Sequence, residues 1–212
     1  MIDITPLQFL GLKYNTDKHD INHTHSNKSY LDEYEEYFLN IKDDVKTVFE
    51  IGVLNGSSLK MWEEYFKNAD IWGLDINPES NKYYGERIRV ITGSQIDKFA
   101  INNIAPNQNF DIVIDDGSHL VDHIIESFNL IFPRVKSGGF YIIEDLGCTY
   151  GDNTPLVNIW PGQKLNPPET NFQNDRNKLN NFFMDLIHNM DARYDMIRSV
   201  KFTYSQCFIK KI

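Results

Sequence analysis

The sequence predicts an α/β fold in which a mostly parallel β-sheet is covered by helices on both faces. Short, almost wholly apolar segments alternate with longer segments whose apolar residues recur at helical spacing. Strands that are apolar throughout are typical of parallel sheets buried on both faces. The last two apolar segments are separated only by a tight turn at Ser205, which indicates an antiparallel hairpin at the C-terminus.

Seven strands and four helices follow in order along the chain. Strands are expected at 47–52, 70–76, 87–93, 110–116, 138–145, 197–204 and 206–212. Helices are expected at 29–42, 57–66 and 120–132, because the apolar residues of each fall on one face, and a further helix is expected at 176–190.

The length of 212 residues fits one domain with a full-sized core. We expect residues 1–42 to form an N-terminal helical and lid segment and 43–146 to form a cofactor-binding core. Residues 147–175 hold Gly, Pro and Asn with little periodicity and are too long for a plain connection, so we expect a lid loop there. Residues 176–212 should supply the last helix and the hairpin.

The net charge of −9 argues against nucleic acid as a partner, because phosphate binding needs a basic surface. The chain shows neither a signal-peptide pattern nor an apolar run long enough to cross a bilayer, and it has only two cysteines, Cys148 and Cys207. The sequence therefore predicts a cytoplasmic protein with free thiols that does not bind membranes.

A glycine turn connects the first strand to the following helix. Gly52 and Gly56 allow a sharp turn and a close approach to a ligand. The helix begins near Ser57 and Ser58, so its free N–H groups could hold a carboxylate or a phosphate. The dinucleotide fingerprint needs three glycines, which makes a nicotinamide cofactor the weaker interpretation.

Two further strand ends extend this candidate cofactor site. Asp75 ends the second strand, 23 residues after Gly52, where a carboxylate can accept from both hydroxyls of a ribose; alternatively, it caps a helix. Ser94 and Gln95 follow the third strand, where an adenine edge would lie, although an ordinary turn would explain them equally well.

Acidic residues crowd the ends of the fourth and fifth strands. Asp115 and Asp116 end one, and Glu144 and Asp145 end the other. Parallel strands end at one edge of the sheet, so these carboxylates should repel one another unless a cation lies among them. Carboxylate oxygens select Mg²⁺, Mn²⁺ or Ca²⁺. The alternative is that individual acids cap helices or face solvent.

His119 follows these acids on the same turn. An imidazole titrates near physiological pH and suits a general base, whereas a lone histidine after a strand is more often structural. The neighbouring acids favour the general base.

Four segments together resemble a known family: EIGVLNGSSLKMWEEYF, WGLDI, FDIVIDDGSH and GGFYIIEDL. They are similar to the metal-dependent sugar O-methyltransferases of natural-product pathways, such as the mycinamicin and elloramycin rhamnose enzymes, and more distantly to the cephalosporin-pathway methyltransferase. The N-terminal Asn15-Thr16-Asp17-Lys18 followed by Tyr30 and Tyr34 is similar to a segment of the same group, although position 15 is usually Gly. The resemblance covers about residues 10–146.

The resemblance implies a Rossmann-like class I methyltransferase fold, S-adenosylmethionine as methyl donor and a divalent metal, expected to be Mg²⁺. It implies His119 and Asp116 as catalytic residues and Asp116, Glu144 and Asp145 as metal ligands. Residues expected around the methyl donor are Glu50, Gly52, Asn55, Gly56, Ser57, Ser58, Asp75, Ile76, Ser94, Gln95 and Asp115. Residues that could contact the substrate are Thr16, Asp17, Lys18, Tyr30, Tyr34 and Tyr150. The three tyrosines and Trp160 could supply a surface on which a sugar stacks, and packing in the core is the alternative for all four.

The predicted function is therefore methylation of a hydroxyl on a sugar or sugar-containing small molecule in carbohydrate biosynthesis, with His119 accepting the proton. Two alternatives stay open. The acceptor could be a phenolic, N- or phosphate-linked group, or the chain could bind the methyl donor without catalysis. The sequence also leaves open whether the chain forms a homo-oligomer.

Overall fold

The computed structural model describes residues 4–20, 28–150, 174–192 and 196–212. Its core is a seven-stranded sheet with strand order β3-β2-β1-β4-β5-β7-β6. The strands are β1 (Thr47–Ile51), β2 (Asp70–Asp75), β3 (Ile88–Thr92), β4 (Phe110–Asp115), β5 (Val135–Ile143), β6 (Ile197–Phe202) and β7 (Cys207–Lys211). The first five strands run parallel, and β7 runs antiparallel to both β5 and β6. The predicted mostly parallel sheet with a C-terminal antiparallel hairpin is confirmed.

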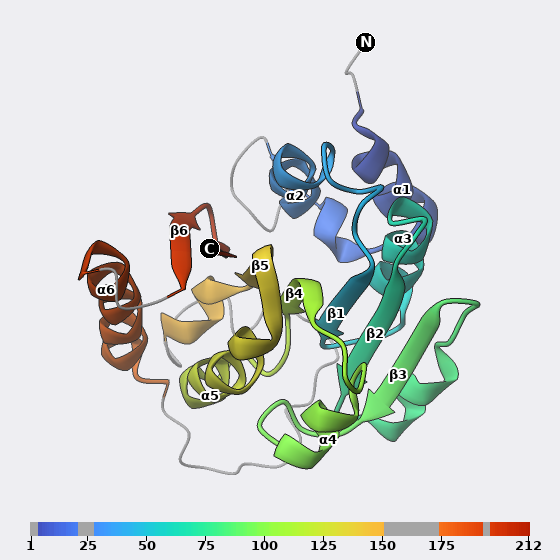
Figure 1. The fold of residues 1–212 in the computed structure, drawn as a ribbon. Coiled ribbons are helices and arrows are strands. Elements are labelled where there is room, and N and C mark those ends of the chain that lie inside the picture. The colour runs from blue at the N-terminus through green and yellow to red at the C-terminus, as the bar shows by residue number, and fades with distance from the viewer. Residues whose placement is uncertain (1–3, 21–27, 151–173, 193–195) are drawn as a thin grey trace.

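The helices cover both faces of the sheet (Figure 1). They are α1 (Pro6–Tyr14), α2 (Tyr30–Phe38), α3 (Ser57–Tyr65), α4 (Lys98–Asn103), α5 (Val121–Ile131) and α6 (Arg176–Ala192). Short 3₁₀ turns lie at η1 (Asp17–His19), η3 (Pro78–Lys82), η4 (Phe132–Arg134) and η5 (Leu146–Tyr150). None of the helices in the described ranges has both the length and the apolar character that crossing a membrane requires.

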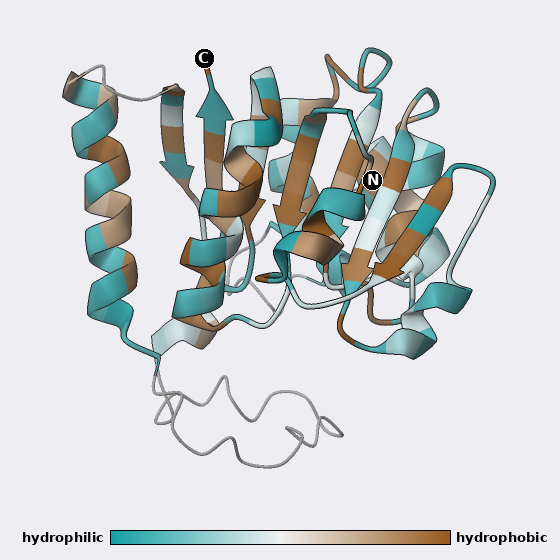
Figure 2. Cartoon of the chain, turned by 60° about the horizontal axis from the view of Figure 1, so that its bottom comes forward, coloured by the Kyte–Doolittle hydropathy of each residue, from teal (hydrophilic) through white to brown (hydrophobic). Residues whose placement is uncertain are grey.

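Successive residues of each central strand point to opposite faces, which divides the core in two. Val113 and Tyr141 belong to the cluster that packs against α4, α5 and α6. Ile112 and Ile142 belong to the cluster under α1, α2 and α3. Figure 2 shows that the strands are predominantly hydrophobic, as expected of a sheet buried on both sides.

Two helices were not predicted, and each has a local explanation. In α1, Leu7 and Leu10 are buried while Phe9 and Leu12 are exposed, so its apolar residues do not mark a single face. Its sequence signal lies in the cap instead, because the Thr5 hydroxyl accepts from the Gln8 backbone N–H and proline follows directly. The other, α4, has only six residues.

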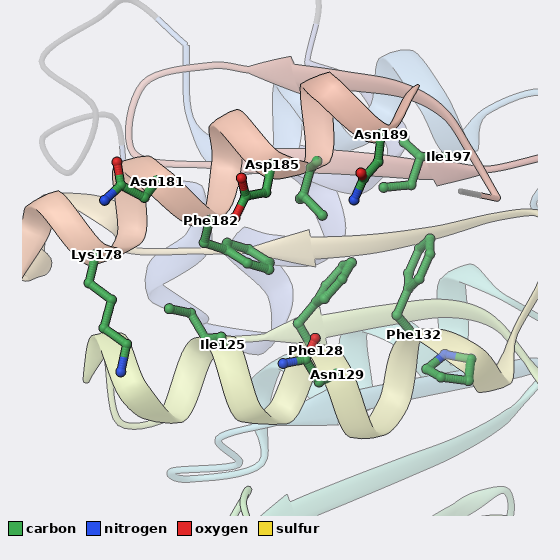
Figure 3. A pocket seen from close by; sticks show the side chains of 12 residues that line it. Ile125, Phe128, Asn129, Phe132, Lys178, Asn181, Phe182, Asp185, Asn189 and Ile197 are labelled. Carbon is green, nitrogen blue, oxygen red and sulfur yellow. The ribbon is translucent and has the colours of Figure 1, made fainter. Parts of the chain in front are cut away.

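A groove separates α5 from α6 (Figure 3). It follows the line along which α6 packs on α5 and β6, where the Phe182 ring centroid lies 5.1 Å from that of Phe128. None of the residues that sequence analysis assigned to cofactor, metal or substrate lines this groove. The predicted metal ligands lie instead at the carboxyl ends of the parallel strands β4 and β5.

Candidate functional site

The backbone ladder continues past the strand ends and fixes the residues that follow them. Gly52 N–H donates to the Leu74 carbonyl over 2.8 Å, Asp116 N–H to the Ile51 carbonyl over 3.0 Å, and Glu144 N–H to the Asp115 carbonyl over 3.0 Å. Residues from four different strand ends are thereby held in register along one edge. This is the edge at which open α/β sheets bind ligands.

Gly52 cannot carry a side chain here. Its φ is +88°, and a Cβ atom at this position would lie 2.0 Å from the carbonyl oxygen of Asp116. Gly56 also has a positive φ, +71°, and directly precedes α3. The glycine turn therefore brings the backbone that follows β1 against the end of β4 and leads directly into α3.

The Asp75 carboxylate organises this turn. Its Oδ2 accepts from the backbone N–H groups of Val53 at 2.8 Å and Leu54 at 3.0 Å, and its Oδ1 accepts from Asn77 N–H at 2.8 Å. A carboxylate oxygen can accept two hydrogen bonds, so Oδ1 keeps one free acceptor position. The residue that caps the following η3 is Asn77 and not Asp75, so the geometry leaves Asp75 Oδ1 an acceptor position toward the rim rather than a helix-capping role.

Glu50 lies beneath the turn rather than at its surface. It is fully buried, and its Oε2 accepts from the Trp62 indole N–H at 2.6 Å. Burial raises the pKa of Glu50 to about 7, although the nearby Lys18 ammonium opposes this shift. In this structure Glu50 is therefore a buried residue that links β1 to Trp62 of α3.

Asp115 and Gln95 form a buried network on the side of the edge that faces α5. Asp115 accepts from the hydroxyls of Ser127 at 2.6 Å and Tyr141 at 3.0 Å and from the Gln95 amide at 3.1 Å. The Gln95 carbonyl in turn accepts from Ser118 N–H at 2.8 Å. Asp115 and Gln95 therefore hold the loop after β4 in place, and sequence analysis did not identify Ser127 or Tyr141 as their partners.

Asp116 points the other way and meets His119 and Asp145 at the rim. One ligand atom from each of these residues lies within 4.8 Å of the other two. His119 Nε2 is 3.8 Å from Asp145 Oδ2, and both side chains are partly exposed. The structure thus brings together three of the four residues predicted as catalytic or metal-binding, in a geometry that could hold a cation.

The backbone is strained at this rim. His119 and Asp145 adopt φ values of 56° and 54°, in the left-handed region, and Leu54 in the glycine turn has a φ of 47°. Such conformations are uncommon for residues other than glycine and cluster at functional sites.

The fourth acid, Glu144, is buried beside Lys18. The Lys18 ammonium lies 2.5 Å from Glu144 Oε2, 2.6 Å from Asp116 Oδ2 and 3.5 Å from Glu50 Oε1. Burial alone would lower the pKa of Lys18, but these carboxylates outweigh it and hold that pKa well above its usual value. Lys18 therefore contacts the acids themselves, a role that sequence analysis did not foresee when it grouped Lys18 with the substrate contacts.

Two tyrosines of α2 complete the inner side of the cluster. The Tyr30 hydroxyl donates to Asp145 Oδ1 at 2.6 Å, and the Tyr34 hydroxyl donates to Glu144 Oε1. Burial raises the pKa of both tyrosines, and the acids add to that shift, so both keep their protons. Tyr34 is fully buried, with its ring edge against Trp62, as the packing alternative expects.

The other predicted contacts lie in varied surroundings. Thr16 is buried and Asp17 is half-buried in η1, while Tyr150 is 58% exposed, with its ring 4.3 Å from the Arg176 guanidinium. Trp160 and most of the predicted lid loop lie outside the described residues. Around the glycine turn, the Asn55 side chain accepts from Ser57 N–H at 3.0 Å, Ser58 is buried, Ile76 is 76% exposed and Ser94 is half-buried.

The charge balance of the cluster favours a bound cation. Within the described part of the chain, Lys18 is the one ammonium in contact with Glu50, Asp116 and Glu144, and Asp145 lies beside His119 instead. Burial raises the pKa of Asp116 and, more strongly, that of Glu144, so ionising them all is unfavourable without further positive charge. A hard divalent cation bound by carboxylate oxygens fits this donor set.

No protein-family model matches the chain. Among curated proteins, the chain is similar to the 8-demethyl-8-alpha-L-rhamnosyl tetracenomycin-C 2'-O-methyltransferase of Streptomyces olivaceus. The two are 36% identical over 156 aligned residues, which make up 70% of this chain and 39% of the relative. The chain is 40% identical over 138 residues to the mycinamicin VI 2''-O-methyltransferase of Micromonospora griseorubida, covering 61% of this chain and 32% of that one. The chain thus spans only about a third to two fifths of these relatives.

Solved structures extend the similarity over nearly the whole chain. The MycE methyltransferase of the mycinamycin pathway, solved with Mg and SAH, is 31% identical with a TM-score of 0.75, covering 98% of this chain and 55% of that one. A putative caffeoyl-CoA O-methyltransferase from Staphylococcus aureus has a TM-score of 0.60 at 14% identity and supports the fold alone. The chain therefore has the class I methyltransferase fold and is related to the sugar O-methyltransferases of the macrolide and tetracenomycin pathways.

Proposed function

We propose that the chain transfers a methyl group from S-adenosylmethionine to a hydroxyl of a sugar or a sugar-containing small molecule, with a divalent cation, Mg²⁺, at the acid cluster. One observation carries the proposal: Asp116, His119 and Asp145 converge at the rim of the sheet next to the glycine turn. The relatives named above act on sugar hydroxyls or were solved with Mg and SAH, which supports the same choice of acceptor, donor and metal.

Each residue of the rim has a proposed task. Asp116, Glu144 and Asp145 would hold the cation, which when bound supplies positive charge that makes a nearby hydroxyl more acidic. His119 would accept the hydroxyl proton on its imidazole, and the Asp145 carboxylate, 3.8 Å away, would stabilise the resulting imidazolium.

The glycine turn and Asp75 would orient the methyl donor. The free acceptor position on Asp75 Oδ1 suits a ribose hydroxyl, and the exposed Ile76 next to it offers an apolar surface for a flat base. Alignment of donor and acceptor supplies a large part of the rate enhancement in such bimolecular reactions.

The test is a screen of sugars, nucleotide sugars, rhamnosylated natural products and simple phenolic acceptors with S-adenosylmethionine and Mg²⁺, read by mass spectrometry for the gain of one methyl group. We expect a methylated sugar product that is lost in chelator and in Asp116→Asn. Methylation of phenolic acceptors alone would contradict the sugar assignment. Binding of the donor without turnover on any acceptor would identify a non-catalytic protein.

A further inference from the structure

Lys18 is the buried positive charge at the centre of the acid cluster. Its side chain is 3% exposed, and its ammonium contacts carboxylates at three strand ends: Glu50 within β1, Asp116 after β4 and Glu144 after β5. The lysine itself comes from η1, 98 residues before Asp116 and 126 residues before Glu144 in the sequence. A salt bridge buried to this degree persists only when its charges satisfy one another closely.

The ammonium uses oxygens that a divalent cation would also need. Lys18 holds Asp116 Oδ2 and Glu144 Oε2, and the other oxygen of Glu144 accepts from the Tyr34 hydroxyl. Among the described residues, Asp116 Oδ1 and Asp145 Oδ2 lie outside these contacts, because Asp145 Oδ1 accepts from Tyr30, and Oδ2 faces His119 at 3.8 Å. A cation binding here therefore meets carboxylates that are already partly neutralised, with a like charge nearby.

We infer that Lys18 is a tethered counter-cation, which competes with the divalent cation for Asp116 and Glu144. The inference rests on the proposed cation site. Without the divalent ion, Lys18 limits repulsion among the acids and keeps the sheet edge assembled. When the divalent ion binds, the Lys18 ammonium weakens the affinity of the site for that ion, because two positive charges then share the same carboxylates.

Calorimetric titration of the metal-free protein with Mg²⁺ and with Mn²⁺ tests this, using Lys18→Met. We expect the variant to bind either ion at least about tenfold more tightly than the unmodified chain, since a nearby repelling charge is gone. We also expect its melting temperature to fall in chelator and to rise more steeply with added ion.

Two control variants separate this effect from a general one. Lys18→Arg keeps the positive charge and should keep affinity close to that of the unmodified chain. Lys13→Met removes a lysine of the same N-terminal segment whose ammonium pairs with Glu64 at 2.5 Å on the surface, and it should change neither the ion affinity nor the metal dependence of melting.

Each outcome decides the inference. A Lys18→Met variant that folds only with Mn²⁺ supports it, since the ion then replaces the lost ammonium. Equal or weaker ion binding by Lys18→Met overturns it and makes Lys18 an orienting residue, while ion binding by the unmodified chain leaves the proposed cation site standing. Failure of the variant to fold even with Mn²⁺ also overturns it. Absence of ion binding by both proteins removes the cation site and the inference together.

Discussion

His119 is the residue on which the proposed proton transfer depends. Its left-handed backbone, with φ of 56°, tolerates asparagine better than alanine, so His119→Asn removes the base with the least disturbance of the turn. We expect kcat to fall by about 10²–10⁴-fold, the usual contribution of a general base, with unchanged affinity for S-adenosylmethionine by calorimetry. The exposed His188→Asn on α6 is the control and should keep full turnover. Unchanged turnover in His119→Asn would exclude His119 from the reaction.

Glu50 should make the stability of the metal-free protein depend on pH. Its pKa rises from 4.5 to about 7 in the folded chain, mainly through burial. The folded state therefore binds the proton more tightly, so this contribution is complete below about pH 4.5 and is lost as the pH rises through about 7. It amounts to at most about 3 kcal/mol of the free energy of unfolding.

The measurement is urea unfolding in chelator between pH 4.5 and 8, comparing the unmodified chain with Glu50→Gln. The amide can still accept from the Trp62 indole, so the variant keeps its packing. We expect the stability difference between the two proteins to shift in favour of Glu50→Gln as the pH rises. A difference that is constant with pH would mean that Glu50 titrates normally in the folded chain.

For individual residues, the sequence predicted the surroundings correctly where the position at a strand end alone decides which side chains meet. Asp116, His119 and Asp145 were expected to meet because parallel strands end at one edge. The opposite orientations of Asp115 and Asp116 depend on where β4 ends, at Asp115, and the predicted strand 110–116 does not mark that point. The contacts of Lys18 with the acids link distant segments, and no local pattern encodes them.

The glycine turn after β1 is the element whose geometry restricts the amino-acid type most strongly. Gly52 and Gly138 both have positive φ, +88° and +78°, but a Cβ at Gly52 would lie 2.0 Å from a backbone oxygen, whereas nothing lies within 4 Å of one at Gly138. We expect Gly138→Ala to cost about 1 kcal/mol of the free energy of unfolding, the cost of the backbone conformation alone. Gly52→Ala should cost more, because the added atom must displace the carbonyl of Asp116.

Denaturant unfolding of the two variants checks this, and calorimetry with Mg²⁺ adds a second readout. Gly52→Ala should also weaken ion binding, since Asp116 is a proposed ligand, while Gly138→Ala should leave it unchanged. Equal losses of stability at the two glycines would show that the turn can relax around a side chain.

Element boundaries were predicted well where amphipathic periodicity is strong and poorly where it is not. The helix at α3 was expected at 57–66 and observed at Ser57–Tyr65, with Met61 and Trp62 buried as predicted. The predicted 29–42 helix ends earlier, at Phe38, because the chain turns after Leu39 toward β1. β5 begins at Val135, three residues before its predicted start, since Gly138 and Gly139 lie within the strand.

The whole molecule is organised by one sheet that serves two cores, and its last strand lies inside that sheet. β7 pairs with β5 on one side and β6 on the other, so the C-terminal hairpin adds two strands beyond β5, and β6 forms the edge of the sheet. Lys201 of β6 also lies 3.3 Å from Glu33 and 3.2 Å from Glu36 of α2, which ties the C-terminal hairpin to the N-terminal helices. We propose on this basis that residues 1–212 form a single domain.

A single domain predicts that the two faces of the sheet unfold together. Trp62 is buried in the cluster under α1–α3, and Trp72 packs against the cluster under α4–α6. The variants Trp72→Phe/Trp160→Phe and Trp62→Phe/Trp160→Phe each leave one tryptophan, so their fluorescence reports one face at a time. Within each variant, we expect the urea unfolding curve by fluorescence to coincide with that by far-UV circular dichroism, because a strand shared by both cores cannot lose one without the other. A fluorescence curve that separates from the circular dichroism curve, in opposite directions for the two variants, would instead divide the chain into independently stable units.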